Sequence, residues 1–292
     1  MLHTRMRWLI AAVALLAMLA TTMLAGPALH SALADSNRPQ EYLALGNSVA
    51  FGFNPSPSID RSNPDNFIGY PTPVAAALKE ALTNASCPGE TSSHFISLTG
   101  SDHGCGAYRA NFPLHVAYST SQLDYADGFL QSHPQTLVVS IDIGANDLFV
   151  LDEGCSFNVN CILAGLPGML ATLSANLNTI YGHIRNTDGY NHKLVALTYY
   201  SLNYSSDPTS MFGTFLISQV NQVVANRTLA WKGIVADGFG AFAAASTAFG
   251  GDTCAAGLRI VVVSSPLTCD IHPSPAGRDL LAQTIVNALR TD

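Results

Sequence analysis

The sequence predicts an α/β fold in which a central parallel sheet is covered by helices on both faces. Short apolar segments that fit strands alternate along the chain with longer segments of helical periodicity, which is the order that a parallel sheet requires. The segment from Thr136 to Gly144 is apolar at nearly every position, as expected for a central strand. Tyr42 to Leu45 has the same character, and the following Gly46 and Asn47 allow a sharp exit from the strand.

The remaining elements follow from the same two periodicities. Helices are expected over Val74 to Leu82, Gln122 to Leu130, Leu163 to Ile184 and Ile217 to Trp231, and strands over Lys193 to Tyr200 and Gly233 to Asp237. A last helix is expected after Ser274, which suits an N-cap, with Pro275 as the first helical residue. Phe53 to Pro73 is rich in Pro, Asn, Ser and Asp and predicts a long ordered loop.

The N-terminal segment has the features of a secretory signal peptide over residues 1–34. Arg5 and Arg7 precede an almost wholly apolar run from Trp8 to Leu24, and Ala32-Leu33-Ala34 matches a cleavage site. The apolar run is long for a signal peptide, so an uncleaved membrane anchor is the alternative. Cleavage after Ala34 would leave residues 35–292, a length that fits a single domain.

The charge balance limits the classes of partner. The chain has 13 Lys and Arg against 20 Asp and Glu, a formal net charge of −7. Nucleic acids and anionic membranes attract basic surfaces, so neither is expected as the main partner. We expect a secreted, extracellular monomer with no stable membrane association after the signal peptide is cleaved.

The cysteines predict disulfides and not a metal site. Six cysteines behind a signal peptide indicate three disulfides, although fifteen pairings are possible. Pairing in sequential order is the simplest hypothesis, and it gives Cys87–Cys105, Cys155–Cys161 and Cys254–Cys269. The sequence has no Cys-x-x-Cys pair, no Cys/His cluster at ligand spacing, no P-loop and no dinucleotide fingerprint, so neither a metal nor a cofactor is expected.

Three polar side chains at the ends of predicted elements form a possible catalytic set. Ser48 follows the first strand, Asn146 follows the strand over Thr136 to Gly144, and His272 is expected on a tight, Pro-flanked loop just before the last helix. A histidine has the pKa needed to accept the proton of a serine hydroxyl. The backbone amides of Ser48 and Gly89 and the side chain of Asn146 are suitable donors to a developing oxyanion. This set predicts a serine hydrolase.

The same residues lie in blocks that resemble the SGNH (GDSL-type) hydrolase family. The blocks are Gly46-Asn47-Ser48, Cys87-Pro88-Gly89-Glu90-Thr91, Gly144-Ala145-Asn146-Asp147 and His272-Pro273. The resemblance extends from about residue 41 to residue 290 and is greatest to the secreted, three-disulfide bacterial esterases and lipases. It implies a flavodoxin-like three-layer α/β/α sandwich with about five parallel strands. It also implies that Ser48 is the nucleophile, His272 the base, and Ser48, Gly89 and Asn146 the oxyanion hole.

Two positions depart from the family pattern. Asn47 replaces the usual Asp before the serine, which we expect to be tolerated because that acid is not the catalytic one. The family places the catalytic acid three residues before the histidine, where this chain has Cys269, whereas Asp270 is two residues before it. Either Asp270 orients the imidazole, or a backbone carbonyl near Cys269 does so in a Ser–His dyad. The sequence slightly favours the dyad.

The α/β-hydrolase fold is the nearest alternative to this fold. Gly46-Asn47-Ser48-Val49-Ala50 approximates the G-x-S-x-G motif, but the second glycine is absent. The serine of that motif also follows several strands, whereas Ser48 comes directly after the first predicted strand.

We therefore expect a secreted serine esterase or lipase that hydrolyses small-molecule or lipid carboxylic esters through an acyl-enzyme on Ser48. A carbohydrate O-deacetylase or a phospholipase on the same scaffold is the alternative activity, and a catalytically inactive binding protein of this fold is the non-enzyme alternative. Four aromatic residues in or beside the long loop could form an apolar wall for an acyl chain or could anchor the loop to the core: Phe51, Phe53, Phe67 and Tyr70.

Overall fold

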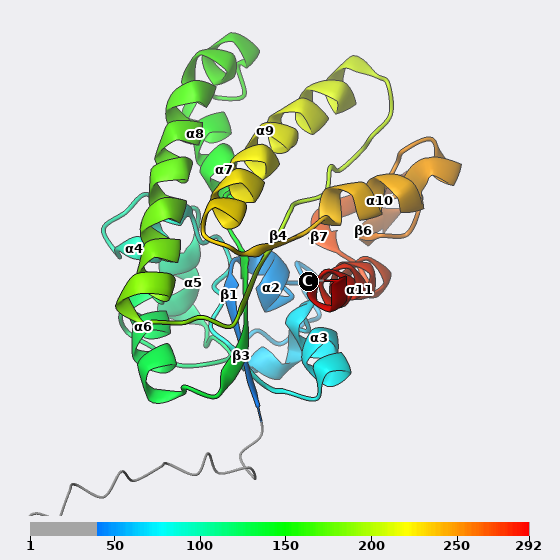
Figure 1. The fold of residues 1–292 in the computed structure, drawn as a ribbon. Coiled ribbons are helices and arrows are strands. Elements are labelled where there is room, and N and C mark those ends of the chain that lie inside the picture. The colour runs from blue at the N-terminus through cyan, green and yellow to red at the C-terminus, as the bar shows by residue number, and fades with distance from the viewer. Residues whose placement is uncertain (1–39, 292) are drawn as a thin grey trace, which may run out of the picture. The chain divides into compact units, whose positions relative to one another are not determined.

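A five-stranded parallel sheet forms the centre of residues 40–291, which are the residues that the computed structural model describes (Figure 1). The predicted signal peptide lies outside them. The strands are β1 (Glu41–Gly46), β2 (Ala81–Asn84), β3 (Thr136–Asp142), β4 (Lys193–Leu197) and β5 (Ile234–Ala236). Their spatial order is β2-β1-β3-β4-β5, and every pair of neighbours is parallel. This is the flavodoxin-like order, so the predicted fold class is confirmed.

Each central strand contributes to two hydrophobic cores, because successive residues of a strand point to opposite faces of a sheet. Leu43 and Leu45 of β1 face one core, while Tyr42 and Ala44 face the other. Helices cover both cores and complete the three layers (Figure 1). The first core is covered by α6 (Gln122–Ser132), α8 (Val159–Gly182) and α9 (Pro208–Ala230), and the second by α3 (Pro71–Leu78), α10 (Gly238–Ser246) and α11 (Pro275–Thr291).

Shorter helices lie in the connections between these elements. They are α2 (Ser48–Phe51), α4 (Ser92–Ile96), α5 (Cys105–Asn111) and α7 (Ala145–Gly154), together with single turns at Pro64–Asn66, His183–Thr187 and Thr247–Phe249. The last helix begins as predicted, because the Ser274 hydroxyl accepts a hydrogen bond from the backbone N–H of Gly277 at 3.2 Å.

The helix expected over Val74 to Leu82 has different bounds. α3 ends at Leu78, and Lys79 then takes a left-handed conformation with φ of 61°. Leu82 therefore belongs to the edge strand β2, which was not predicted. An apolar residue at this spacing fits both a continued helix and a short strand, and β2 has only four residues from which to distinguish them.

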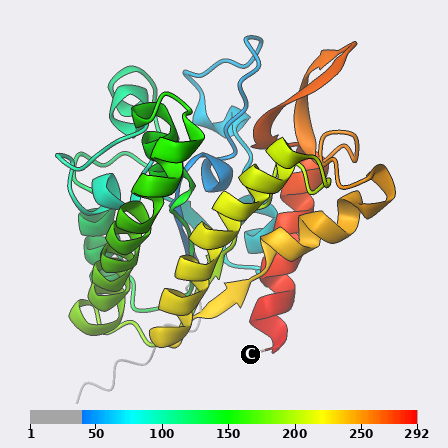
Figure 2. The same ribbon diagram turned by 90° about the horizontal axis from the view of Figure 1, so that it is seen from above.

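A second, antiparallel sheet carries the C-terminal site residues. β6 (Arg259–Ser264) and β7 (Leu267–Pro273) form a hairpin that is separate from the main sheet (Figure 2). His272 was expected on a tight loop before the last helix, but it lies within β7. The run Ile260-Val261-Val262-Val263 is a strand signal that the sequence analysis did not use.

The structure joins the cysteines in the predicted pairs, Cys87–Cys105, Cys155–Cys161 and Cys254–Cys269. The first pair ties the turn after β2 to the start of α5, and the second closes the α7–α8 connection. The third joins β7, at the residue directly before Asp270, to the segment that follows α10.

Candidate active site

The structure brings Ser48 and His272 into contact at the carboxyl end of the sheet. Ser48 begins α2, two residues after the last residue of β1, and His272 lies near the end of β7. The Nε2 atom of His272 is 2.8 Å from the Oγ atom of Ser48, although 224 positions separate the two residues in the sequence. His272 is almost buried and Ser48 is half-buried. A serine hydroxyl in this position can pass its proton to the imidazole.

Asp270 is the partner on the other side of the imidazole. Its Oδ1 atom accepts hydrogen bonds from the Nδ1 atom of His272 and from the backbone N–H of the same residue, the latter at 2.9 Å. The structure therefore does not have the arrangement that the sequence slightly favoured, a dyad oriented by a backbone carbonyl. The reason is the local conformation: β7 is extended, and residues two apart on a strand point to the same face.

The environment keeps Asp270 ionised. Burial by itself would raise the pKa of Asp270, but the hydrogen bonds from His272 and the positive charge of Arg259 together hold it below the ordinary value. The Arg259 guanidinium donates a hydrogen bond to the Asp270 backbone carbonyl at 3.2 Å. The Tyr200 hydroxyl donates another to the carbonyl of Ile271 at 2.6 Å. The strand is therefore anchored at both residues that precede the base.

The turn that presents Ser48 depends on Gly46. This residue has φ of 131°, and a Cβ atom there would lie 2.3 Å from the Oδ1 atom of Asp142. The Gln122 side chain holds the same residue on its other side: its Oε1 atom accepts from the Gly46 N–H at 2.5 Å, and its Nε2 atom donates to the Gly46 carbonyl at 3.0 Å. The position of Ser48 is thus fixed by long-range contacts and not by the turn alone.

Asp142, the single acid in the β3 sequence, lies beneath this turn. It is fully buried, and burial raises its pKa well above the ordinary value. The Tyr70 hydroxyl donates a hydrogen bond to its Oδ1 atom at 3.0 Å. Burial therefore favours the neutral form of Asp142, in contrast to Asp270, whose pKa is lowered.

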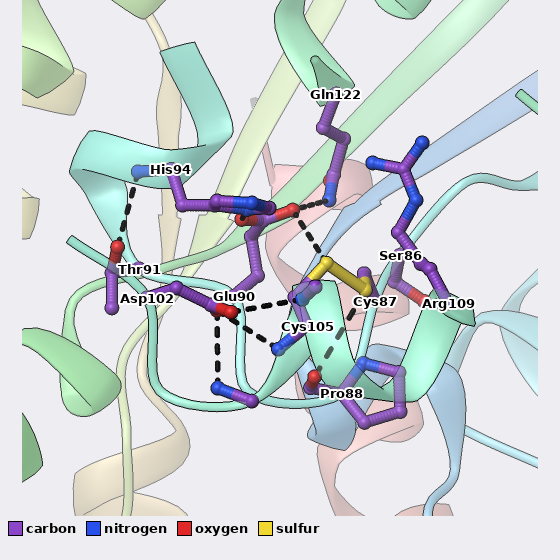
Figure 3. Close-up of a disulfide and its surroundings, with 12 residues drawn as sticks. Ser86, Cys87, Pro88, Glu90, Thr91, His94, Asp102, Cys105, Arg109 and Gln122 are labelled. Carbon is purple, nitrogen blue, oxygen red and sulfur yellow. Dashed lines mark hydrogen bonds and ion pairs between the residues drawn. A yellow bond between two sulfur atoms is a disulfide. The ribbon is translucent and has the colours of Figure 1, made fainter. Parts of the chain in front are cut away.

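A buried polar cluster connects Gln122 to the first disulfide (Figure 3). The Glu90 carboxylate is fully buried, accepts a hydrogen bond from Gln122 Nε2 at 3.0 Å and contacts the Nδ1 atom of His94 at 2.5 Å. Burial raises the pKa of Glu90, and the hydrogen bond to Glu90 raises the pKa of His94. Glu90 also lies 3.4 Å from the Cys105 sulfur, but both sulfurs are in the disulfide and cannot serve as thiolate ligands of a metal.

The predicted oxyanion donors have different positions. Asn146 lies in the first turn of α7 and, with Ser48, lines one pocket. Its Nδ2 atom donates to the Glu90 carbonyl at 2.8 Å, which leaves its second N–H free to donate elsewhere. Gly89 is not among the described residues that line this pocket. It has φ of 83°, and a Cβ atom there would meet the His103 carbonyl oxygen at 2.5 Å, so packing alone requires a glycine.

The pocket beside Ser48 is mainly apolar and has a volume of about 360 Å³. Side chains from α7, α9 and the segments after β4 and within β7 form its wall: Leu148, Phe149, Tyr199, Leu202, Leu216, Ile217 and Ile271. The aromatic loop residues do not form this wall. Phe51, Phe67 and Tyr70 are buried in the core, and Phe53 packs on the His272 ring at a centroid distance of 5.0 Å. Their role is therefore to anchor the loop and the base.

Several residues of this site were not predicted from the sequence. Gln122, Tyr200 and Arg259 contact the site residues from elements far away in the chain, and no local motif marks them. The start of α9, which contributes to the pocket, does have a sequence signal. Asp207 caps this helix by accepting a hydrogen bond from Ser210 N–H at 3.0 Å, and Pro208 is its first residue.

Comparison with known proteins gives relatives by structure alone. No protein-family model matches the sequence, and no curated protein matches it either. Solved structures that resemble the chain include an extracellular lipase from Streptomyces rimosus, with a TM-score of 0.57 and 19% identity over 85% of this chain and 99% of that one. Phospholipase A1 from Streptomyces albidoflavus gives 0.58 and 19%, with 87% of this chain and 99% of that chain covered.

An acetylxylan esterase from Geobacillus stearothermophilus is also similar, with a TM-score of 0.53 and 16% identity over 86% of this chain and 94% of that one. Together with the strand order, these likenesses show that the chain has the SGNH hydrolase fold. The identities are low, so the activity has to be argued from the site itself.

Proposed function

We propose that the protein is a serine ester hydrolase that cleaves carboxylic esters through an acyl-enzyme on Ser48. The observation that carries this proposal is the hydrogen-bonded series from Ser48 Oγ through the His272 ring to the Asp270 carboxylate, at the wall of an apolar pocket. A nucleophile, a base and an orienting acid in this order are the parts that acyl transfer needs.

In the first half of the proposed reaction, His272 Nε2 accepts the hydroxyl proton while Ser48 Oγ attacks the ester carbonyl carbon. Negative charge develops on the carbonyl oxygen, and the free N–H of Asn146 and the Ser48 backbone amide are the donors in reach of the pocket. The ionised Asp270 stabilises the imidazolium and holds Nδ1 protonated. Gly89 is the weakest of the predicted donors, because it is absent from the described pocket wall.

The second half regenerates the enzyme. The tetrahedral intermediate collapses, the bond from the carbonyl carbon to the alcohol oxygen breaks, and His272 returns the proton to the leaving alcohol. A water molecule then attacks the acyl-Ser48 ester while His272 accepts its proton; the bond from the acyl carbon to Ser48 Oγ breaks, His272 returns the proton to Ser48 Oγ, and the carboxylic acid leaves. This sequence requires no cofactor.

The character of the pocket favours an acyl chain over a sugar. The surface that lines it is mainly apolar, although polar residues such as Asp152 and Asn203 also contribute, and each methylene group buried there contributes about 0.8 kcal/mol to binding. An esterase or lipase therefore fits better than a carbohydrate O-deacetylase. A phospholipase fits the acyl pocket equally well. The disulfides and the predicted signal peptide support an extracellular location.

The test is hydrolysis of p-nitrophenyl esters from acetyl to palmitoyl by the wild type and by Ser48→Ala. We expect kcat/KM to rise with chain length beyond acetyl, and Ser48→Ala to lose at least about three orders of magnitude while remaining folded by circular dichroism. Preference for acetyl esters and acetylated sugars would instead support the deacetylase. Absence of turnover on every ester would reject the enzyme and favour the binding-protein alternative.

A further inference from the structure

The β6–β7 hairpin exposes a group of apolar side chains that no core covers. Val261, Val262 and Val263 are 49%, 53% and 47% exposed, and Leu267 on β7 is 48% exposed. Because successive strand residues point to opposite faces, three consecutive exposed valines mean that both faces of β6 are open to solvent. The hairpin extends from the body of the molecule (Figure 2). Exposed apolar clusters of this kind mark interaction sites.

The exposed surface is continuous with the candidate active site. Ile271 is 37% exposed on β7 and also lines the pocket beside Ser48. On the other side of the pocket, Leu202 is 39% exposed and is a lining residue as well. An occupant that covers the hairpin therefore meets the mouth of the pocket.

The charges on the hairpin select the chemistry of the occupant. No residue between Arg259 and Asp270 carries a charge, and the chain as a whole has a net charge of −7. An anionic lipid surface would be repelled by the protein and would gain no cation on the part of the hairpin between Arg259 and Asp270. An electrically neutral lipid surface can take up the apolar side chains and meet no opposing charge.

We propose that the β6–β7 hairpin docks the enzyme reversibly on a neutral lipid surface and holds the pocket mouth against it. The inference builds on the proposed esterase function, because the docked surface supplies the acyl chains. It refines the expectation of no stable membrane association: the uncharged part of the hairpin between Arg259 and Asp270 gives a reversible contact and not an anchor.

The experiment measures vesicle binding separately from turnover. The protein is prepared with Ser48→Ala, so that lipids are not hydrolysed, and is sedimented with phosphatidylcholine vesicles. The test variant carries V261T, V262T and V263T, which keep the β-branched shape and strand preference but remove apolar surface. The control is Leu229→Gln, which removes an apolar side chain that is 61% exposed near the C-terminal end of α9.

We expect the triple variant to reduce the partition coefficient on phosphatidylcholine at least tenfold and Leu229→Gln to change it less than twofold. With Ser48 restored, the triple variant should hydrolyse a soluble short-chain ester at the wild-type rate. Phosphatidylglycerol vesicles should bind no better than phosphatidylcholine vesicles.

Three results would overturn the docking inference. They are absence of wild-type binding to phosphatidylcholine, equal binding by the triple variant, and a wild-type dimer in gel filtration that the triple variant converts to a monomer. The last result would assign the hairpin to a second copy of the chain. Vesicle binding that persists in a protein unable to hydrolyse any ester would reject the proposed activity and leave the docking intact.

Discussion

The candidate site joins two regions that are stabilised in different ways. The Gly46–Ser48 turn is embedded in the main sheet, where Gln122 and Asp142 fix it from two sides. Asp270 and His272 lie on a hairpin outside that sheet, held by a disulfide, by Arg259 and by Tyr200. The nucleophile therefore depends on close packing, whereas the acid and base depend on a few discrete attachments. Substitutions in the two regions should therefore affect the stability and the activity of the protein in different ways.

The largest expected effect distinguishes the two buried or half-buried acids. Asp270→Asn removes the ionised partner of His272 and should lower kcat by about 10⁴-fold without unfolding the protein. Asp142 is hydrogen-bonded to Tyr70 in the core and not to the His272 ring, so Asp142→Asn should lower kcat less than tenfold. The measurement is kcat on a soluble ester for both variants, with melting temperatures as the folding check. Equal losses in the two variants would contradict the assignment of Asp270 as the orienting acid.

Packing around the nucleophile is tested at Gly46. Gly46→Ala would put a Cβ atom 2.3 Å from Asp142 Oδ1 and 2.4 Å from its backbone oxygen, so we expect a destabilisation of about 3 kcal/mol or more. The melting temperature should fall by about 10 °C. Gly189→Ala is the matched control, because Gly189 also has positive φ, of 65°, but open space at its Cβ position. That control should cost about 1–2 kcal/mol.

The attachment of the hairpin is tested by C254S/C269S. A cross-link that closes a loop of this length contributes about 3 kcal/mol, and its loss frees β7 next to Asp270. On heating, esterase activity should disappear at a lower temperature than the far-UV circular dichroism signal. The control C155S/C161S removes a disulfide of sequence separation 6 away from the hairpin, and there the two transitions should coincide. Coincident transitions in both variants would mean that the hairpin unfolds with the sheet.

The smallest expected effect concerns the pH dependence of stability. Burial raises the pKa of Glu80, before β2, to about 7. The folded state therefore binds this proton more tightly than the unfolded state, and stability is lost as the pH rises through 7. Glu80→Gln should melt at a higher temperature than the wild type at pH 8.5, by an amount below about 1 kcal/mol because Glu80 is half-exposed, and the difference should close at pH 5.

The contribution of Asp270 to stability depends on pH with the opposite sign. Its pKa is lowered in the folded protein, so the stability that it contributes is present at neutral pH and disappears only as the pH falls through the lowered value. Asp270→Asn should thus cost stability at pH 7 and approach the wild type in strong acid.

A Glu80→Gln difference that grows toward low pH would contradict the assigned direction of the Glu80 shift.

The sequence predicted the region around Ser48 better than the region around His272. The strands β1 and β3 are continuous apolar runs followed by glycine, so their ends and the residues beyond them could be placed from the sequence. The segment before His272 has a cysteine where the family has an acid, and a loop was assumed. The structure has a strand there, whose period of two brings Asp270 onto the histidine.

The contacts between residues far apart in the sequence could not be predicted. Gln122 is an ordinary polar residue at the start of a helix until α6 packs beside β1, 76 positions away in the sequence. The aromatics of the long loop could have formed an apolar wall or anchored the loop, and the structure shows that they anchor it: Phe51, Phe67 and Tyr70 are buried, and Phe53 packs on His272. The wall comes instead from α7, α9 and the segments after β4 and within β7, which are far apart in the sequence and meet only in the folded protein.

The alternation along β7 also restricts how this segment can evolve. Asp270 and His272 share one face of the strand, and an insertion or deletion of one residue between them would turn one of the two side chains to the opposite face. Length variation near the site is therefore confined to the tip of the hairpin, between Ser264 and Leu267. Changes there can alter the reach of the hairpin toward its partner surface while the acid and the base keep their register.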